Sequence, residues 1–350
     1  MAQIDKLFHL LKERKGSDLH ISVGAPPLLR ISGDLTPVTN NILPQNETKK
    51  LLYEIMTPFQ QQRFEENLET DFAYAVEGIA RFRANVFMQH RGIAAVFRLI
   101  PEEILSVEQL SLPKQIINFA KLYKGLVLCT GPTGSGKSTT LAALIDYVNS
   151  TRSEHIITIE DPIEFVHNNK KCLVNQRELG AHTESFSAAL RSALREDPDV
   201  ILVGEMRDLE TIQLAMTAAE TGHLVFGTLH TSSAAKTIDR IIDVFPSAQQ
   251  GQVRSMLSES LMGVMAQTLL KKTGGGRIAA IEILVGSPAI SNLIRENKTY
   301  QIPSVLQTSK SEGMQTLDMA LLDLYQKRRI SANDCIDRAS DKKVMRAALG

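Results

Sequence analysis

The octapeptide at residues 131–138 is Gly-Pro-Thr-Gly-Ser-Gly-Lys-Ser, and it matches every position of the phosphate-loop pattern. An apolar run at residues 126–130 precedes it, and a segment with apolar residues at helical spacing, residues 141–148, follows it. A glycine-rich turn between a strand and a helix is the context in which such a loop binds phosphate. The octapeptide therefore predicts a nucleotide-binding α/β domain.

The residue types in this loop suit ATP bound together with Mg²⁺. The glycines let the backbone curl, so that successive N–H groups face the β-phosphate. Lys137 supplies positive charge for the β- and γ-phosphates, and the Ser138 hydroxyl is a Mg²⁺ ligand. The predicted nucleotide-binding residues are Gly131, Pro132, Thr133, Gly134, Ser135, Gly136, Lys137, Ser138 and Thr139.

Short apolar runs alternate with helical segments after this loop, which predicts a parallel sheet covered on both faces. The expected strands are residues 126–130, 156–159, 200–203 and 224–229. After residue 247 the sequence predicts a largely helical region with one more strand at residues 278–285.

Acidic residues follow two of the expected strands, and ligands of parallel sheets bind beyond the carboxyl ends of strands. Residues 160–164, Glu-Asp-Pro-Ile-Glu, could supply a carboxylate that deprotonates the attacking water. Glu205 could support Mg²⁺ alone, since Gly204 replaces the usual first acid. A solvated acidic loop and a strand-end cap are the alternatives that the residues leave open.

Two histidines bracket the fourth expected strand, residues 224–229. His230 follows the carboxyl end of the strand, where an imidazole could sense the γ-phosphate and pass that state onward. His223 precedes the strand. A structural role is the alternative for both residues.

The first hundred residues predict a separate mixed α/β domain, followed by a linker at 101–113 and an ATPase domain at 114–350. Residues 81–88 alternate, with Phe82, Ala84, Val86 and Met88 on one face, and a turn at 89–92 predicts a hairpin with residues 93–100.

Two arginines, Arg81 and Arg83, share the other face of that alternating segment. A solvated strand face is one interpretation. The other is a pair of arginine fingers that reach a nucleotide held by a neighbouring subunit.

The composition disfavours several classes of protein. Lysine plus arginine equals aspartate plus glutamate, 39 against 39, whereas a nucleic-acid binder usually has a basic excess. Cys129, Cys172 and Cys335 are too scattered for a metal cluster or a disulfide framework. The sequence shows no signal peptide and no apolar run near the roughly 20 residues that span a bilayer. We therefore expect a cytoplasmic protein without nucleic-acid partners or membrane insertion.

Four motifs in this order resemble the secretion and type IV pilus ATPases of the RecA-like phosphate-loop class. They lie at residues 131–138, 158–165, 203–208 and 222–231. Residues 289–296, Ala-Ile-Ser-Asn-Leu-Ile-Arg-Glu, narrow the resemblance to the retraction ATPases of that family. Ser291 stands where their signature usually has arginine.

The resemblance implies a PAS-like N-terminal domain, a homohexameric ring and ATP bound between subunits. Carried over by motif, Glu164 activates water, Glu205 supports Mg²⁺ and His230 reads the γ-phosphate. Arg81 and Arg83 come from an adjacent protomer.

The implied function is a motor at the cytoplasmic base of the pilus in the inner membrane, which powers pilus retraction and twitching motility. Its implied partners are an inner-membrane platform protein and a paralogous retraction ATPase. One alternative is that the chain is itself the accessory paralogue, which shares every nucleotide motif. A nucleic-acid translocase on the same scaffold and a small-molecule phosphotransferase are alternatives of other classes; the zero net charge argues against the former.

Overall fold

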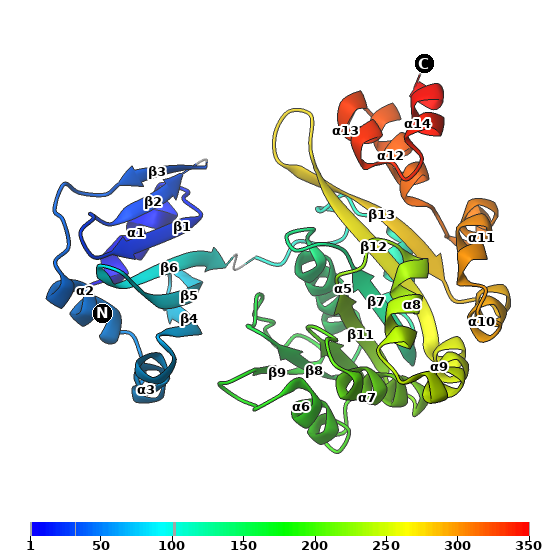
Figure 1. The fold of residues 1–350 in the computed structure, drawn as a ribbon, viewed down its shortest axis with the longest axis horizontal. Coiled ribbons are helices and arrows are strands. Elements are labelled where there is room, and N and C mark those ends of the chain that lie inside the picture. The colour runs from blue at the N-terminus through cyan, green and yellow to red at the C-terminus, as the bar shows by residue number, and fades with distance from the viewer. Residues whose placement is uncertain (1, 32, 101–102, 350) are drawn as a thin grey trace. The chain divides into compact units, whose positions relative to one another are not determined.

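The computed structural model describes residues 2–31, 33–100 and 103–349, which divide into two compact units (Figure 1). The first unit comprises Met1–Glu103 and Pro162–Val166, and the second comprises Ile104–Asp161 and His167–Gly350. Each unit has its own sheet and its own helices. The expected α/β fold class is confirmed.

The first unit contains a six-stranded antiparallel sheet in the order β3-β2-β1-β6-β5-β4. Its core forms around Phe8, whose ring stacks on Phe82 at 4.1 Å and meets Phe97 edge-on at 5.1 Å. In chain order its elements are α1 (Asp5–Glu13), β1 (Asp18–Ser22), β2 (Leu28–Ile31), β3 (Asp34–Pro37), α2 (Gln45–Tyr53), α3 (Pro58–Asn67), β4 (Glu69–Val76), β5 (Ala80–Gln89) and β6 (Gly92–Ile100).

The predicted hairpin is present as β5 and β6, joined where Gln89 pairs with Gly92. Phe82, Ala84, Val86 and Met88 stand at alternate positions of β5 and so share one face, as expected. The first three are buried, whereas Met88 is 44% exposed. It lies one residue from the end of the strand, beyond the stretch that the core covers.

The second unit is built on a seven-stranded sheet in the order β13-β12-β7-β11-β10-β8-β9, parallel except for β13. Its elements begin with α4 (Ile117–Ala120), β7 (Gly125–Thr130), α5 (Lys137–Thr151), β8 (His155–Glu160), β9 (Leu173–Glu178), α6 (Phe186–Ala193), β10 (Val200–Val203), α7 (Leu209–Glu220) and β11 (Leu224–Leu229). They continue with α8 (Ala234–Asp243), α9 (Ser247–Ser260), β12 (Leu261–Lys271), β13 (Arg277–Val285), α10 (Pro288–Arg295), α11 (Ile302–Thr308), α12 (Leu317–Gln326), α13 (Ala332–Arg338) and α14 (Lys342–Leu349).

All five strands expected in this unit form, but two further strands, β9 and β12, were not expected. The expectation of one strand after residue 247 was wrong, because β12 runs for eleven residues beside β7. Its sequence, LMGVMAQTLLK, is rich in residues that favour helices and lacks a β-branched run. It also follows α9 with no intervening loop, since α9 ends at Ser260 and β12 begins at Leu261.

The pairing of β12 with β7 contains one irregularity. Leu261 pairs with Leu126 and Gly263 pairs with Val127, so Met262 is an extra residue in the ladder. Beyond this bulge Met265 faces the core on the α5 side of the sheet, whereas Val264 faces the core on the opposite side.

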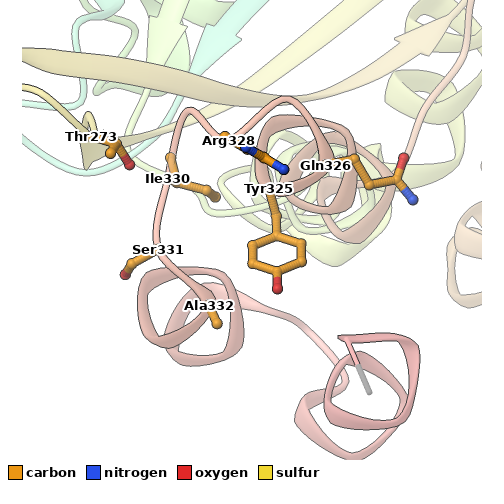
Figure 2. Close-up of a pocket in the computed structure, with 7 residues that line it drawn as sticks. All are labelled: Thr273, Tyr325, Gln326, Arg328, Ile330, Ser331 and Ala332. Carbon is orange, nitrogen blue, oxygen red and sulfur yellow. The ribbon is translucent and has the colours of Figure 1, made fainter.

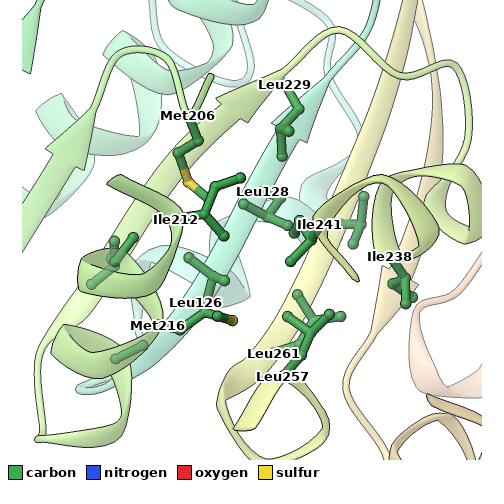
Figure 3. Packing of buried hydrophobic residues seen from close by; sticks show 14 of the residues in the cluster. Leu126, Leu128, Met206, Ile212, Met216, Leu229, Ile238, Ile241, Leu257 and Leu261 are labelled. Atoms are coloured by element: carbon green, nitrogen blue, oxygen red, sulfur yellow. The ribbon is translucent and has the colours of Figure 1, made fainter. Parts of the chain in front are cut away.

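Two apolar clusters cover the two faces of the large sheet. One packs the sheet against α6 to α11 and contains Leu126 and Leu128 of β7 with Ile212 of α7 and Ile241 of α8 (Figure 3). The other packs it against α4 and α5, and Val107 and Leu112 of the segment expected to be a linker belong to it.

A smaller cluster joins the C-terminal helices α12 to α14 to the β12–β13 hairpin. A pocket of about 340 Å³ lies beside it, lined by Thr273, Tyr325, Gln326, Arg328, Ile330, Ser331 and Ala332 (Figure 2). No residue predicted for the nucleotide site lines this pocket. Among the residues that the structure describes, no helix is long and apolar enough to cross a membrane.

Leu128→Ala should destabilise the second unit, because Leu128 is fully buried on the central strand β7. Removing a leucine from such a core costs about 2–5 kcal/mol. Leu173→Ala is the control: Leu173 is 51% exposed on β9, and its loss should change stability by less than about 0.5 kcal/mol. Urea unfolding followed by circular dichroism measures both. Equal effects would contradict the core described here.

Candidate functional site

The carboxyl ends of four parallel strands reach one edge of the large sheet. Leu229 of β11 pairs with Thr130 of β7, and Val203 of β10 lies between Gly227 and Ile159 of its neighbours. The phosphate loop follows directly after β7 and His230 directly after β11, while Glu205 follows β10 after one residue, Gly204. The sequence prediction that they gather beyond one sheet edge is consistent with this register.

The phosphate loop connects β7 to α5, whose first residue is Lys137. Gly131 has φ +143° and Gly136, at the N-cap of α5, has φ +89°, conformations that favour glycine. Pro132, Thr133 and Gly134 are exposed, while Ser135 is buried. Ser138 and Thr139 lie half-buried in the first turn of the helix.

Lys137 folds back over its own loop. Its Nζ donates hydrogen bonds to the carbonyl oxygens of Gly131 at 2.9 Å and Pro132 at 3.3 Å. Positive charge and the N-terminal end of α5 are therefore held at the same loop, an arrangement that favours an anion.

Glu205 and His230 are brought together from β10 and β11. His230 Nε2 lies 3.0 Å from Glu205 Oε1. Arg207 contacts the same carboxylate with both ends of its guanidinium, Nε to Oε1 at 2.5 Å and Nη2 to Oε2 at 2.6 Å. Such a two-point contact is stronger and more directional than a single hydrogen bond.

The surroundings of Glu205 hold it ionised. Burial raises the pKa of this carboxyl, but the hydrogen bonds and charge of Arg207, together with His230, outweigh burial and lower the pKa below its usual range. The same contact raises the pKa of Arg207. An ionised carboxylate is the form in which glutamate supports a cation.

Gly204 occupies the position before Glu205 for a steric reason. A Cβ atom there would lie 3.0 Å from the carbonyl oxygen of Ile159 and 3.2 Å from the Cα atom of Glu160 on β8. The close approach of β8 and the end of β10 therefore makes any side chain at residue 204 a tight fit, which favours glycine there.

The two glutamates of the acidic segment, Glu160 and Glu164, have different surroundings. Glu160 accepts hydrogen bonds from Thr158 Oγ1 at 2.6 Å and from Gln176 Nε2 at 3.2 Å, so it is held within the sheet edge. Glu164 is half-buried within residues 162–166, which belong to the first compact unit. Its role as the base stays a prediction.

Arg81 and Arg83 lie at alternate positions of β5 and so on the same side of the six-stranded sheet. Arg83 lies 4.0 Å from Asp71 on β4, and its directly paired residue on β6 is Arg98. Arg98 Nε in turn donates to Asp18 Oδ1 at 2.9 Å. Several guanidiniums therefore share this face of the sheet.

His223 and Ser291 make local hydrogen bonds. His223 lies before the amino end of β11, and its Nδ1 is 3.0 Å from the carbonyl oxygen of Ala218 at the end of α7. Ser291 Oγ donates to the carbonyl oxygen of Ser258 at 2.6 Å and so links α10 to α9. Ile290 and Ile294 of α10 are buried in the same core.

Three residues of the site region were not predicted. Arg207 lies two residues beyond Glu205, and a basic residue so close to the acid was the available signal. Arg98 could be found only once the register of β5 and β6 was known. Gln267 of β12 contacts the phosphate loop, and no signal in the sequence indicated it, because its strand was not recognised.

Comparison with known proteins places the chain among secretion proteins. The family described as "Type II/IV secretion system protein" matches residues 4–275. The chain is 58% identical to the type IV pilus "retractation" ATPase PilT of Pseudomonas aeruginosa, covering 96% of this chain and 98% of the relative. It is 41% identical to the type IV pilus ATPase PilU of the same organism, covering 98% and 91%. A crystal structure of the pilus retraction motor PilT with bound ADP is 49% identical, with a TM-score of 0.92 over 99% of both chains.

Arg207→Met should change how stability depends on pH. The folded-state pKa of Glu205 is lowered, so its ionised form stabilises the fold above the ordinary value of 4.5, and this contribution is lost as pH falls through the lowered pKa. The variant should therefore lose more unfolding free energy at pH 7 than at about pH 3, as measured by urea unfolding. Arg195→Met, which replaces an exposed arginine, is the control. An equal loss at both pH values in Arg207→Met would contradict the pairing.

Proposed function

Because the chain belongs to the type II/IV secretion system protein family, we propose that it is an ATP-hydrolysing motor that powers type IV pilus retraction and hence twitching motility. The observation that carries the retraction assignment is the 58% identity to a retraction ATPase over nearly the full length of both chains. The phosphate loop in its strand–helix setting carries the ATPase assignment.

Residues 131–139 bind the phosphates of ATP in this proposal. The backbone N–H groups of the loop and the N-terminal end of α5 face the anion, and Lys137 moves from its own loop carbonyls to the β- and γ-phosphates. The exposure of Pro132, Thr133 and Gly134 is compatible with such an approach from solvent.

Mg²⁺ would be held by Ser138 and Glu205. The donor set fits this ion, because Mg²⁺ at a nucleotide is usually bound through one or two protein oxygens with phosphates and water completing the shell. Glu205 is ionised, and the described residues contain no cluster of three or more His, Cys, Asp or Glu side chains that would make a dedicated metal cage. The ion supplies charge neutralisation at the phosphates.

Glu164 takes a proton from the attacking water, and His230 reads the γ-phosphate. The 3.0 Å contact between His230 and Glu205 supports the second role, since a change at either group alters the hydrogen bonding of the other. Helix α8 follows His230 in the chain, so a movement of His230 would be passed to α8, which packs on the sheet.

Arg81 and Arg83 act on the nucleotide of a neighbouring protomer, within a homohexamer. Arg83 and Arg98 lie directly opposite each other on β5 and β6, and their carboxylate partners are Asp71, 4.0 Å from Arg83, and Asp18. The side chain of Arg83 is 45% exposed, which leaves its guanidinium accessible to a phosphate group from another subunit. The ring works at the cytoplasmic side of the inner membrane at the pilus base, on a platform protein there.

Two alternatives are less well supported. An accessory retraction ATPase is disfavoured because the identity to PilU is 41%, against 58% to PilT of the same organism. A nucleic-acid translocase is disfavoured by the balance of 39 basic and 39 acidic residues.

Lys137→Ala should abolish ATP turnover, because it removes the ammonium that meets the phosphates, and should leave the fold intact, because alanine is favourable in the helical turn where residue 137 lies. Phosphate release measures turnover, and twitching of a Pseudomonas aeruginosa strain that lacks PilT measures retraction when the chain is supplied in trans. The unchanged chain should restore twitching and Lys137→Ala should not. Hydrolysis by Lys137→Ala at the parent rate would refute the assignment of the loop.

The double variant Arg81→Ala, Arg83→Ala should bind ATP but hydrolyse it about 10³ to 10⁵ times more slowly, as for other arginine fingers. Mixed with Lys137→Ala under subunit exchange, it should regain activity, because mixed rings pair an intact loop with intact arginines. ATPase rate is measured against mixing ratio. No excess over the two separate rates, despite proven exchange, would mean that the arginines do not act between subunits.

A further inference from the structure

A buried glutamine links β12 to the phosphate loop. Gln267 is only 4% exposed, and its side-chain amide uses both of its ends. Nε2 donates a hydrogen bond to the carbonyl oxygen of Ser135 at 2.6 Å, and Oε1 accepts one from Thr140 Oγ1 at 2.8 Å. Since a carbonyl oxygen can only accept, the Ser135 contact fixes which end of the amide is the nitrogen.

Along the sequence, the two residues that Gln267 contacts flank the residues proposed to bind phosphate and metal. Ser135 belongs to the loop, and Thr140 belongs to the first turn of α5; Lys137 and Ser138 lie between them. The amide of Gln267 therefore ties the loop and the helix start to the same point on β12.

The hydrogen bond to Ser135 also sets the direction of one backbone N–H group. In a planar trans peptide the carbonyl oxygen and the next N–H point in opposite directions. The Ser135 carbonyl points to Gln267, so the N–H of Gly136 must point away from Gln267. That N–H is one of the donors that a phosphate loop offers to its ligand.

The glycines of the loop fit closely around this strand. A Cβ atom on Gly131 would lie 2.3 Å from the backbone oxygen of Gln267, and one on Gly136 would lie 2.9 Å from its Nε2. Both glycines also have positive φ. A side chain at either position would therefore collide with Gln267, so the close approach of the loop to β12 depends on both glycines.

We infer that Gln267 is a positioning residue for nucleotide binding, which orients the Gly136 N–H and the first turn of α5 before ATP arrives. This inference rests on the proposed ATPase function. It differs from a role in stability alone, because it predicts a loss of nucleotide affinity that does not follow when another hydrogen-bonded glutamine, distant from the loop, is replaced.

The test uses the purified full chain and a fluorescent ADP analogue with Mg²⁺. Gln267→Met keeps the length of the side chain but removes both hydrogen bonds, and it should raise Kd about tenfold or more, as expected for an orphaned buried carbonyl. In steady-state assays KM should rise more than kcat falls. Thr140→Val, which removes only the orienting hydroxyl, should raise Kd by less. The double variant should be no weaker than Gln267→Met, because one interaction is lost in both.

Gln315→Met is the matched control. Gln315 Nε2 also donates to a backbone carbonyl, that of Ile281 on β13 at 2.7 Å, but it does not contact the loop. Both methionine variants should lower Tm, whereas only Gln267→Met should change Kd. Equal Kd values for Gln267→Met, Thr140→Val and the parent, with the parent binding normally, would overturn the inference. Failure of the parent itself to bind would instead overturn the proposed function. If Gln267→Met does not fold, Thr140→Val decides.

Discussion

The parallel register of β7, β11, β10 and β8 is the constraint on which the second unit depends. Because these strands run in one direction and pair in a continuous parallel register, a loop, an acid and an imidazole from distant parts of the chain emerge at one edge. The apolar clusters on both faces fix the strands in that register. Within the site, Glu205 is held by two further contacts, one with His230 and one with Arg207.

Much of this arrangement could be predicted because short stretches of consecutive residues determine it. Residues 200–203 and 224–229 are continuous apolar runs of the kind that fully buried parallel strands require, and both strands form with those bounds. The phosphate loop has a fixed spacing of glycines, and the polar residues after each strand could be assigned to the sheet edge by topology alone. The contact between Glu205 and His230 was not itself predicted, but it is consistent with that placement.

What could not be predicted depends on tertiary packing. Residues 261–271 have the composition of a helix and directly continue one, yet burial between β7 and β13 makes them a strand. Gln267 could not be assigned to the loop without that strand. Val107 and Leu112 lie in a polar, broken stretch, and only the structure reveals that they enter the core under α4 and α5. The alternation along β5 assigns Met88 to the face of Phe82 but does not reveal where the core ends, and Met88 is 44% exposed.

The direct junction of α9 with β12 restricts how this part of the chain can evolve. A strand alternates its side chains between faces, so inserting or deleting one residue between the junction and residue 267 would exchange the two faces of the strand beyond that point. The bulge at Met262 already takes up one extra residue and sets the phase in which residue 267 faces α5. With no loop between Ser260 and Leu261, there is no spacer in which a change of length could be absorbed. Lineages can therefore vary this stretch by substitution, while its length should be held constant.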